Sequence, residues 1–244
     1  MTLDYSRLYA KFHPENPKHR HGLTLLHHRM LGPHLPVDRS AAILDVGCGR
    51  GYALQDLAAL GYTRLTGIDP DAGQVAFARN LRLEVTQVED TEAFLTARPD
   101  TYAVILLMDV LEHLPRGAQP GLLRAVARSL RSGGRLICSV PNAGSAIGSF
   151  WLHNDYTHHW SFTADSLSFL MEQTGFARVR CLGVEFFLRP LFLFWLPTPR
   201  SLAWWLRCCL RLRQRATYVA ELGWSRGREV ILTPNLLAVA DKAG

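Results

Sequence analysis

The chain has 244 residues, of which 48% are apolar, and a formal net charge of +6. A chain of this size and composition can bury a full core, which excludes a small fold that depends on disulfides or a structural metal. No run reaches the roughly 20 apolar residues of a membrane span, and the first residues have no apolar segment typical of a signal peptide.

The five cysteines show neither CxxC pairing nor the spacing of a zinc site. They indicate reduced thiols, so we expect a cytoplasmic protein. The positive charge indicates an anionic partner or surface, and residues 187–228 contribute strongly to it with eight arginines and one acid.

Strand-like runs alternate with helical windows from residue 41 to residue 186. The expected strands are 41–46, 64–69, 83–88, 102–108 and 134–140, and the expected helices are 52–60, 72–80, 91–97 and 118–131. Nearly continuous apolar strands that alternate with helices imply a parallel sheet covered on both faces. The sequence therefore predicts a doubly wound α/β fold.

Another helix follows the polar run "HNDYTHHWSFT", residues 153–163. Thr163 can cap it, Phe162 can pack on Leu167, and Gly175 can end it. The polar run therefore connects strand 134–140 to this helix. In a doubly wound sheet this connection lies at the carboxyl edge of the strands, where ligands bind.

A glycine-rich turn, "ILDVGCGRGY", follows the first strand. Gly47, Gly49 and Gly51 allow a tight turn and a close approach of the backbone to a ligand. A dinucleotide-binding turn would need a glycine where Tyr52 stands. Asp69, at the end of the second strand, suits two ribose hydroxyls, but such an acid occurs in both NAD and S-adenosylmethionine sites.

Four segments occur in a familiar order: "LDVGCGRG", "GIDPD", "MDVLEHLP" and "LRSGGRLICSVPN". In this order they resemble the class I S-adenosylmethionine-dependent methyltransferases, and most of all the branch with ubiquinone-type and bacterial glycan O-methyltransferases. The resemblance covers residues 40 to 180 and resumes at "VILTPNLLAVADK". It implies a seven-stranded Rossmann-like sheet whose last strand is antiparallel. The last two strands are then expected at 178–185 and 229–240.

The resemblance also implies the cofactor, S-adenosyl-L-methionine, and the residues around it. The expected cofactor-binding residues are Asp45, Gly47, Cys48, Gly49 and Gly51 near the methionine part, Asp69 and Pro70 near the ribose, Asp90 (or Glu89) near the adenine, and Met108, Asp109 and Val110 along the pocket. Two alternatives stay open: the glycines could form a plain turn, and Asp90 could only cap the next helix.

Methyl transfer to a hydroxyl is helped by a base, and histidine titrates in the useful range. The candidates are His113, His158 and His159. A segment of the form D-F/Y-T-H-x-x-S-F-T occurs in the related glycan branch, and this chain matches it from Asp155 to Thr163. We therefore expect His158 to be the base, with Asp155 orienting an imidazole or holding the acceptor. Alternatively, these two residues only pin the loop, and His113 packs beside the cofactor.

The same run raises the alternative of a metal site. His153, Asp155, His158 and His159 are suitable ligands, but they lack the regular spacing of zinc sites. We expect no required metal, and Mg²⁺ if there is one, since some relatives use it.

The residues between the last two strands are too many for a simple link. Arg207, Arg211 and Arg215 recur every four residues, and the opposite side carries Leu202, Trp205, Leu206, Cys209 and Leu210. This pattern predicts an amphipathic helix. It could be a lid over the acceptor, a homodimer surface, or a contact with an anionic membrane, and the apolar "FFLRPLFLFWL" stands before it.

The chain is thus expected to divide into an N-terminal helical cap (1–40), a cofactor-binding core (41–186), an aromatic and basic insertion (187–228) and a final strand (229–244). Leu23, Leu26 and Met30 predict a helix that caps the cofactor cleft, with its histidines in solvent.

The leading hypothesis is a methyltransferase that acts on a hydroxyl of a small-molecule or glycan-like acceptor, lipid-linked ones included. A quinone-type phenol, an amino sugar methylated at nitrogen, and a cofactor-binding scaffold without catalysis are the alternatives. A nucleic acid is not expected, because "MDVLEH" stands where a nucleobase amino-methyltransferase would carry D/N-P-P-Y/F, and because the charge is concentrated beside tryptophans.

Overall fold

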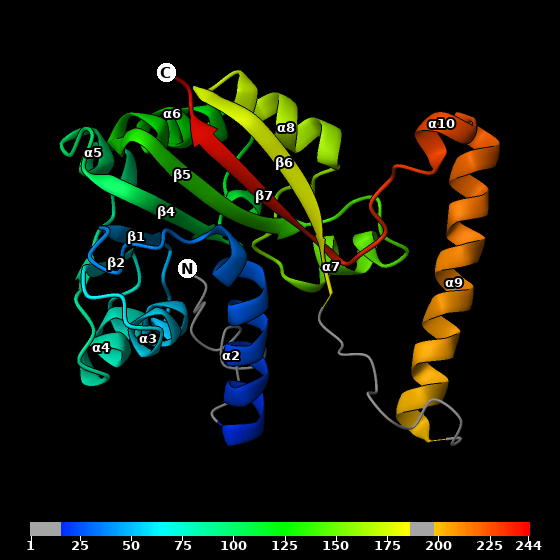
Figure 1. Cartoon of the computed structure of the whole chain (residues 1–244), viewed down its shortest axis with the longest axis horizontal. Helices are drawn as coiled ribbons and strands as arrows, with labels where there is room; N and C mark the ends of the chain where they lie inside the picture. Colours follow the sequence, from blue (N-terminus) through cyan, green and yellow to red (C-terminus); the bar gives the residue numbers. More distant parts are fainter. Residues whose placement is uncertain (1–15, 186–197) are drawn as a thin grey trace.

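A computed structural model of the chain describes residues 16–185 and 198–244. Within them, one sheet has the strand order β3-β2-β1-β4-β5-β7-β6. The strands are β1 (Ile43–Val46), β2 (Leu65–Asp69), β3 (Val85–Gln87), β4 (Tyr102–Met108), β5 (Leu130–Pro141), β6 (Phe176–Val184) and β7 (Asn235–Lys242). All pairs are parallel except those of β7, which runs antiparallel to β5 and β6. The predicted doubly wound fold and its antiparallel last strand are confirmed (Figure 1).

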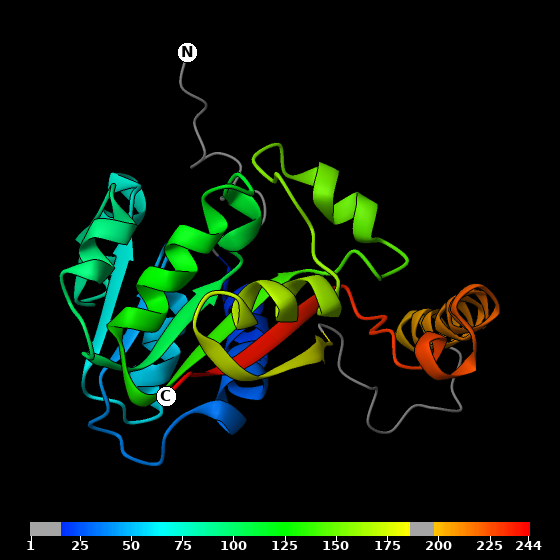
Figure 2. The ribbon, with the colours of Figure 1, turned by 90° about the horizontal axis from the view of Figure 1, so that it is seen from above.

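Helices cover both faces of the sheet (Figure 2). They are α2 (Pro17–Leu31), α3 (Tyr52–Ala59), α4 (Ala72–Asn80), α5 (Thr91–Thr96), α6 (Gln119–Ser129), α7 (Gly148–Asn154), α8 (Ala164–Glu172), α9 (Pro199–Leu222) and α10 (Trp224–Gly227), with 3₁₀ turns η1 (Gly32–His34) and η2 (Leu111–His113). Side chains alternate along each strand, so β4 packs Ile105 and Leu107 against α5, α6 and α8, and Val104 and Leu106 against α2 and α3. Both faces are buried, and this explains the continuous apolar runs.

The helix after the polar run begins as predicted. Thr163 accepts a hydrogen bond from the backbone N–H of Ser166, and the Ser166 hydroxyl accepts one from the backbone N–H of Thr163. Phe162 and Leu167 share the same core. The helix itself stops at Glu172, and Gly175, with a φ of +104°, makes the turn into β6.

The bounds of several elements differ from the sequence-based expectation; β5, for example, begins at Leu130 and not at residue 134. The last strand begins at Asn235 and not at residue 229, because Pro234 lacks the N–H that a ladder needs. Helix α7 was not expected, because "NAGSAIGSF" shows no helical periodicity. Gly148 allows this helix to start against the preceding loop, since a Cβ there would lie 2.7 Å from the Asn142 carbonyl oxygen. The polar run thus begins inside α7.

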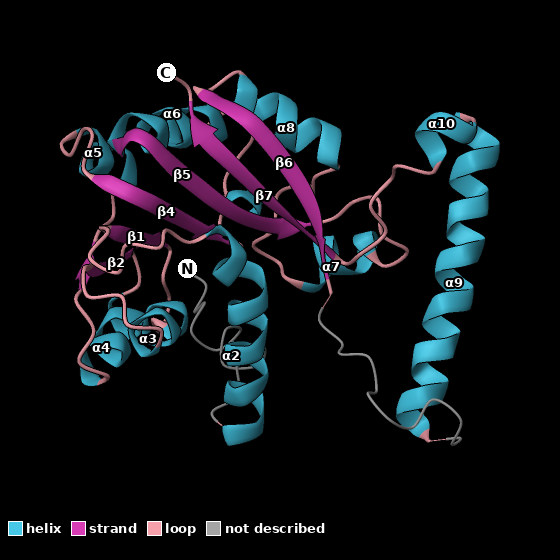
Figure 3. Cartoon of the chain, in the orientation of Figure 1, coloured by secondary structure: helices cyan, strands magenta, loops and turns pink. Residues whose placement is uncertain are grey.

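Helix α9 stands beside the end of the sheet (Figure 3). The predicted separation of its two sides is confirmed, and its basic side faces the body of the protein. Arg211 donates hydrogen bonds to Glu185, just after β6, and Gln214 and Tyr218 donate to the carbonyl of Gly144. No described helix is long and apolar enough to cross a membrane. The segment "FFLRPLFLFWL" lies outside the described residues.

An ion pair fastens α2 to α3. The buried carboxylate of Asp56 accepts hydrogen bonds from Arg20 at 3.0 Å, Thr24 at 3.0 Å and His27 at 2.6 Å. The expectation that the histidines of α2 are solvated is therefore wrong for His27. Burial alone would raise the pKa of Asp56, but the hydrogen bonds from His27 and Arg20 and their charges outweigh it and lower the pKa to about 2.

Replacing Asp56 by Asn is expected to lower the free energy of unfolding by about 2 kcal/mol at neutral pH. Because the folded pKa lies below the unfolded one, this stability is present above about pH 4 and is lost as the pH falls towards 2. Urea unfolding at pH 7 and pH 3 measures the difference. Asp165→Asn, at an exposed ion pair, is the control and should change little. An Asp56→Asn effect that is equal at the two pH values would contradict the assignment.

Candidate functional site

A cavity of about 1530 Å³ opens at the carboxyl edge of the sheet. Helix α2 forms one wall with Leu23, Leu26, His27 and Met30, and the segment from Trp151 to His158 forms another. The predicted site residues that line it are Asp45, Gly47, Cys48, Gly49, Asp69, Pro70, Asp90, Met108, Asp109, Val110, His113, Asp155 and His158. Two predicted residues, Gly51 and His159, do not line it.

The glycine turn is shaped by both backbone conformation and space. Gly47, Gly49 and Gly51 all have positive φ, at 69°, 51° and 73°. A Cβ on Gly47 would lie 2.7 Å from Val110 Cγ2, and one on Gly51 would lie 2.5 Å from Leu83 Cδ1. Gly51 is the N-cap of α3 and supports the turn from behind the cavity. The turn therefore needs glycine at these positions whatever it binds.

Two buried aspartates flank this turn. Asp69 accepts hydrogen bonds from the backbone N–H groups of Gly49 at 2.8 Å and Asp71 at 2.9 Å. Asp45 is buried, and its Oδ1 has no hydrogen-bond partner among the described residues. Burial, and then the charge of Asp69, raise the pKa of Asp45 to about 8. A buried acid without a partner is costly, and it indicates a place where a ligand supplies a donor or a positive charge.

Asp90 caps a helix, which is the alternative role that the sequence left open. It is the N-cap of α5, and its Oδ1 accepts from the backbone N–H of Ala93 at 2.9 Å. The residue is exposed at the rim of the cavity, beside Glu89. A cap and an adenine contact are compatible, because a carboxylate accepts several hydrogen bonds.

The imidazole of His158 has a defined tautomer. Its Nδ1 lies 2.9 Å from the carbonyl oxygen of Trp151, which can only accept, so Nδ1 carries a proton. In the neutral ring, Nε2 is then a proton acceptor, and it lies 3.9 Å from the carboxylate of Asp155. The backbone of Trp151 therefore prepares His158 to take up a proton at Nε2.

A hydrogen-bond chain fixes the tautomer of His113 in the same way. The Thr157 hydroxyl donates to Asp155 at 2.6 Å, so it can only accept from His113 Nδ1 at 2.8 Å. The two rings meet edge to face with centroids 4.6 Å apart. Burial, and then the neighbouring His158, lower the pKa of His113 to about 4. His113 is therefore neutral at physiological pH.

Carboxylates after β4 complete the centre of the cavity. Asp109, with a φ of +56°, accepts hydrogen bonds from Ser139 at 2.8 Å and Asn235 at 3.1 Å. Glu112 is fully buried, and neither of its carboxyl oxygens has a hydrogen-bond partner among the described residues. Burial, followed by the charges of Asp109 and Asp155, raises the pKa of Glu112 well above its usual value. This environment favours the protonated form of Glu112, unless a cation or a donor joins it.

His159 does not enter the cavity. Its side chain is exposed, and its backbone N–H donates to the carbonyl of Glu112 at 2.7 Å. Adjacent residues in an extended segment face opposite ways, so only one of His158 and His159 can point inward. The selection of His159 as a candidate catalytic residue therefore has no support in the geometry.

Sequence reasoning missed several residues around the centre. Glu112 was not among the expected site residues, Trp151 lies in the unexpected helix α7, and Ser139 and Asn235 carry no local motif. Asn235 reaches the site only because β7 pairs with β5, where it lies opposite Pro141. Only the expectation that the last strand returns beside β5 could have suggested it.

Among residues 16–185 and 198–244, one group of side chains has the geometry to hold a metal. Ligand atoms of Glu112, His113 and His158 all lie within 4.8 Å of one another. This set differs from the one considered on the sequence, because His153 and His159 are exposed. Two imidazoles and a carboxylate would suit a transition metal rather than Mg²⁺, which prefers oxygen ligands. The expectation of no required metal stays a prediction.

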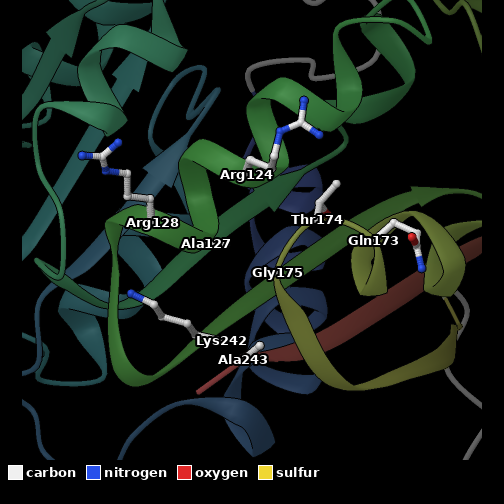
Figure 4. A pocket seen from close by; sticks show the side chains of 8 residues that line it. All are labelled: Arg124, Ala127, Arg128, Gln173, Thr174, Gly175, Lys242 and Ala243. Atoms are coloured by element: carbon white, nitrogen blue, oxygen red, sulfur yellow. The ribbon is translucent and has the colours of Figure 1, made fainter.

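A second, smaller hollow lies at the opposite edge of the sheet (Figure 4). Arg124 and Arg128 point away from each other there, and Lys242 is bonded to Asp100 and the carbonyl of Leu130. No set of side chains converges in this hollow, so the large cavity is the candidate site.

Comparisons with known proteins show the family of the chain. Residues 13–180 match the family model of a methyltransferase domain. The ubiquinone biosynthesis O-methyltransferase of Ruegeria sp. (strain TM1040) is 32% identical over 178 residues, which are 66% of this chain and 69% of that protein. The protein of the same name from Dinoroseobacter shibae is 33% identical over 178 residues, with the same coverage.

Solved structures share the fold. A S-adenosylmethionine-dependent methyltransferase from Archaeoglobus fulgidus aligns with a TM-score of 0.70 at 18% identity, covering 98% of this chain and 100% of that one. The phosphoethanolamine N-methyltransferase 2 of Haemonchus contortus, solved with S-adenosylmethionine, aligns with a TM-score of 0.60 at 14% identity, covering 100% of this chain and 61% of that one. The chain belongs to the methyltransferase domain family and is a class I S-adenosylmethionine-dependent methyltransferase.

Proposed function

We propose that the glycine turn and the aspartates beside it hold the cofactor. The unpartnered Asp45 would meet the ammonium group of its methionine part, and Asp69, fixed by the N–H groups of Gly49 and Asp71, would hold the ribose hydroxyls. Met108 and Val110 would line the pocket, and Asp90 would lie at the adenine end. The residues fit the cofactor because the turn leaves no room for side chains and because Asp45 lacks the donor that an ammonium supplies.

Binding of the cofactor should release a proton from Asp45. Without ligand its pKa is raised to about 8, so it is protonated at neutral pH, and a neighbouring ammonium would favour the carboxylate. Calorimetric titrations at pH 7 in buffers of different ionisation enthalpy should detect up to about one proton released. Asp45→Asn should abolish the release and weaken binding roughly tenfold, whereas Asp165→Asn should leave both unchanged. Equal proton release in wild type and Asp45→Asn would disprove this role.

We further propose that the methyl group goes to a hydroxyl of the acceptor. The observation that carries this proposal is the tautomer of His158, whose Nδ1–H is held by the Trp151 carbonyl while Nε2 is left as the acceptor in a ring that lines the cavity. S-adenosylmethionine supplies an already activated methyl group. The protein then has to align the hydroxyl and receive its proton, and His158 would do so with Asp155 near the imidazolium that forms.

Two acceptor classes have specific support. The curated relatives that match over two thirds of their length are named ubiquinone biosynthesis O-methyltransferases, and the apolar wall of Leu23, Leu26 and Met30 suits a quinone-type phenol. The segment from Asp155 to Thr163 instead resembles the glycan branch. We favour the phenol, because its hydroxyl is more acidic than that of a sugar and is more easily deprotonated by a neutral histidine. An amino sugar or a scaffold without turnover has no comparable support.

Replacing His158 by Ala tests the base. The turnover number should fall by a factor of roughly 10² to 10⁴, while the dissociation constant for S-adenosylmethionine changes little. His159→Ala is the matched control, because the imidazole of His159 is exposed outside the cavity. Turnover with a catechol-type phenol, measured as S-adenosylhomocysteine formed, gives the comparison. If both variants keep full activity, His158 is not the base.

Several wider expectations also remain proposals. We infer a cytoplasmic protein that uses no nucleic acid, as a monomer or a homodimer. The positive charge of the chain is concentrated in the insertion.

A further inference from the structure

Helix α9 presents its apolar side to the solvent. Leu206 and Leu210 are each 55% exposed and Leu212 is 72% exposed, with Leu202 and Trp205 on the same side. A long stripe of leucine and tryptophan facing outward is unusual, because a surface helix normally buries it. Something other than the described residues of this chain is needed to cover it.

The orientation of α9 is fixed by its other side. The guanidinium of Arg211 lies against Glu185, the Gln214 and Tyr218 side chains both donate to the Gly144 carbonyl, and Arg215 donates to the Gly227 carbonyl at 2.8 Å. These contacts span the helix from its middle to its last turns. The helix therefore cannot bury its apolar side by rotation without losing them.

The charge of the helix selects what can cover that side. Helix α9 contains five arginines and one acid, the exposed Glu221 in its last turn. Glu185 forms ion pairs with both Arg207 and Arg211, at 4.0 Å and 2.5 Å. Glu185 and Glu221 cannot neutralise the five arginines of α9, so the helix stays cationic. The exposed Arg213 lies on its apolar side. In a symmetric dimer this cationic helix would face a copy of itself. An anionic lipid surface offers both the opposite charge and apolar depth for leucine and tryptophan.

We propose that the apolar side of α9 docks on an anionic membrane surface, with the helix lying in the plane of the interface. The helix is joined to the cavity through Gly144, whose loop leads from β5 to α7. Ile147, just before α7, and Phe150 on that helix are exposed, while Trp151 and Asn154 line the cavity. Docking at α9 therefore brings one wall of the cavity close to the lipid. Delivery of an apolar acceptor from the lipid to the cavity rests on the proposed function. The docking itself rests only on the surface of α9.

The test is sedimentation of the full chain with vesicles. Vesicles of equal parts phosphatidylcholine and phosphatidylglycerol should carry wild-type protein down, and vesicles of phosphatidylcholine alone should carry down much less. A Leu206→Glu/Leu210→Glu variant should bind the anionic vesicles roughly tenfold more weakly. Phe169→Glu on α8, at a residue 65% exposed, is the matched control and should bind as wild type does. Leu212→Glu is a second variant and should weaken binding in the same direction.

Affinity for S-adenosylhomocysteine, measured on the same preparations, shows that each variant is folded and separates this proposal from the proposed function. Wild-type protein that ignores anionic vesicles, or a double variant that still binds them, would overturn the docking. A concentration-dependent dimer in light scattering that the double variant abolishes, without vesicle binding, would also overturn it and assign the surface to a second copy of this chain.

Discussion

The structure depends on one electrostatic constraint: several carboxyl groups are buried together at the carboxyl edge of a parallel sheet. Asp45 and Asp69, near the ends of β1 and β2, and Glu112, one turn after β4, are buried, and the more exposed Asp109 lines the same cavity. Burial and mutual repulsion raise the pKa of Asp45 and of Glu112. Such a cluster is tolerated only where hydrogen bonds, protonation or a cationic ligand compensate for it.

The cluster is compensated differently along the cavity. At the glycine turn, backbone N–H groups satisfy Asp69, and Asp45 is left with an oxygen that lacks a partner. Further along, Ser139 and Asn235 hold Asp109, while Glu112 has no donor among the described residues. The first region suits the cationic end of a sulfonium cofactor. The second lies beside two imidazoles whose tautomers are fixed by Trp151 and Thr157, and it suits an acceptor whose hydroxyl loses a proton.

The sequence predicts the parts that depend on local chemistry. The apolar runs predict the sheet, the glycine spacing predicts the turn, and Thr163 predicts the start of α8. Other features depend on contacts between distant residues. Helix α9 turns its basic side inward because of Glu185 and Gly144, which lie 26 residues before Arg211 and 70 residues before Gln214. The sequence also allowed residues 187–228 to form a lid over the acceptor. This role is not supported, because none of the described residues of the insertion lines the cavity.

The sequence alone could not show which of the two neighbouring histidines enters the cavity, because this depends on the folded path of the loop. His158 and His159 look equivalent in "DYTHHW", and only the path of the loop directs one into the cavity and the other outward. The burial of Glu112 was equally hidden, because a glutamate after a strand usually reads as a solvated cap. The motif "LEHLP" indicated that this segment lies at the site, but the fold determined which of its polar side chains is buried away from solvent.

The most direct test of the account is calorimetric titration with S-adenosylmethionine, S-adenosylhomocysteine and NAD, using wild type and Asp69→Ala. We predict that both sulfur compounds bind and that NAD does not. Asp69→Ala should weaken binding of both sulfur compounds by about 2 kcal/mol through the loss of charge-assisted hydrogen bonds to the ribose. Tight binding of NAD, or an Asp69→Ala variant that binds the sulfur compounds as wild type does, would contradict the assignment of this turn as the cofactor site.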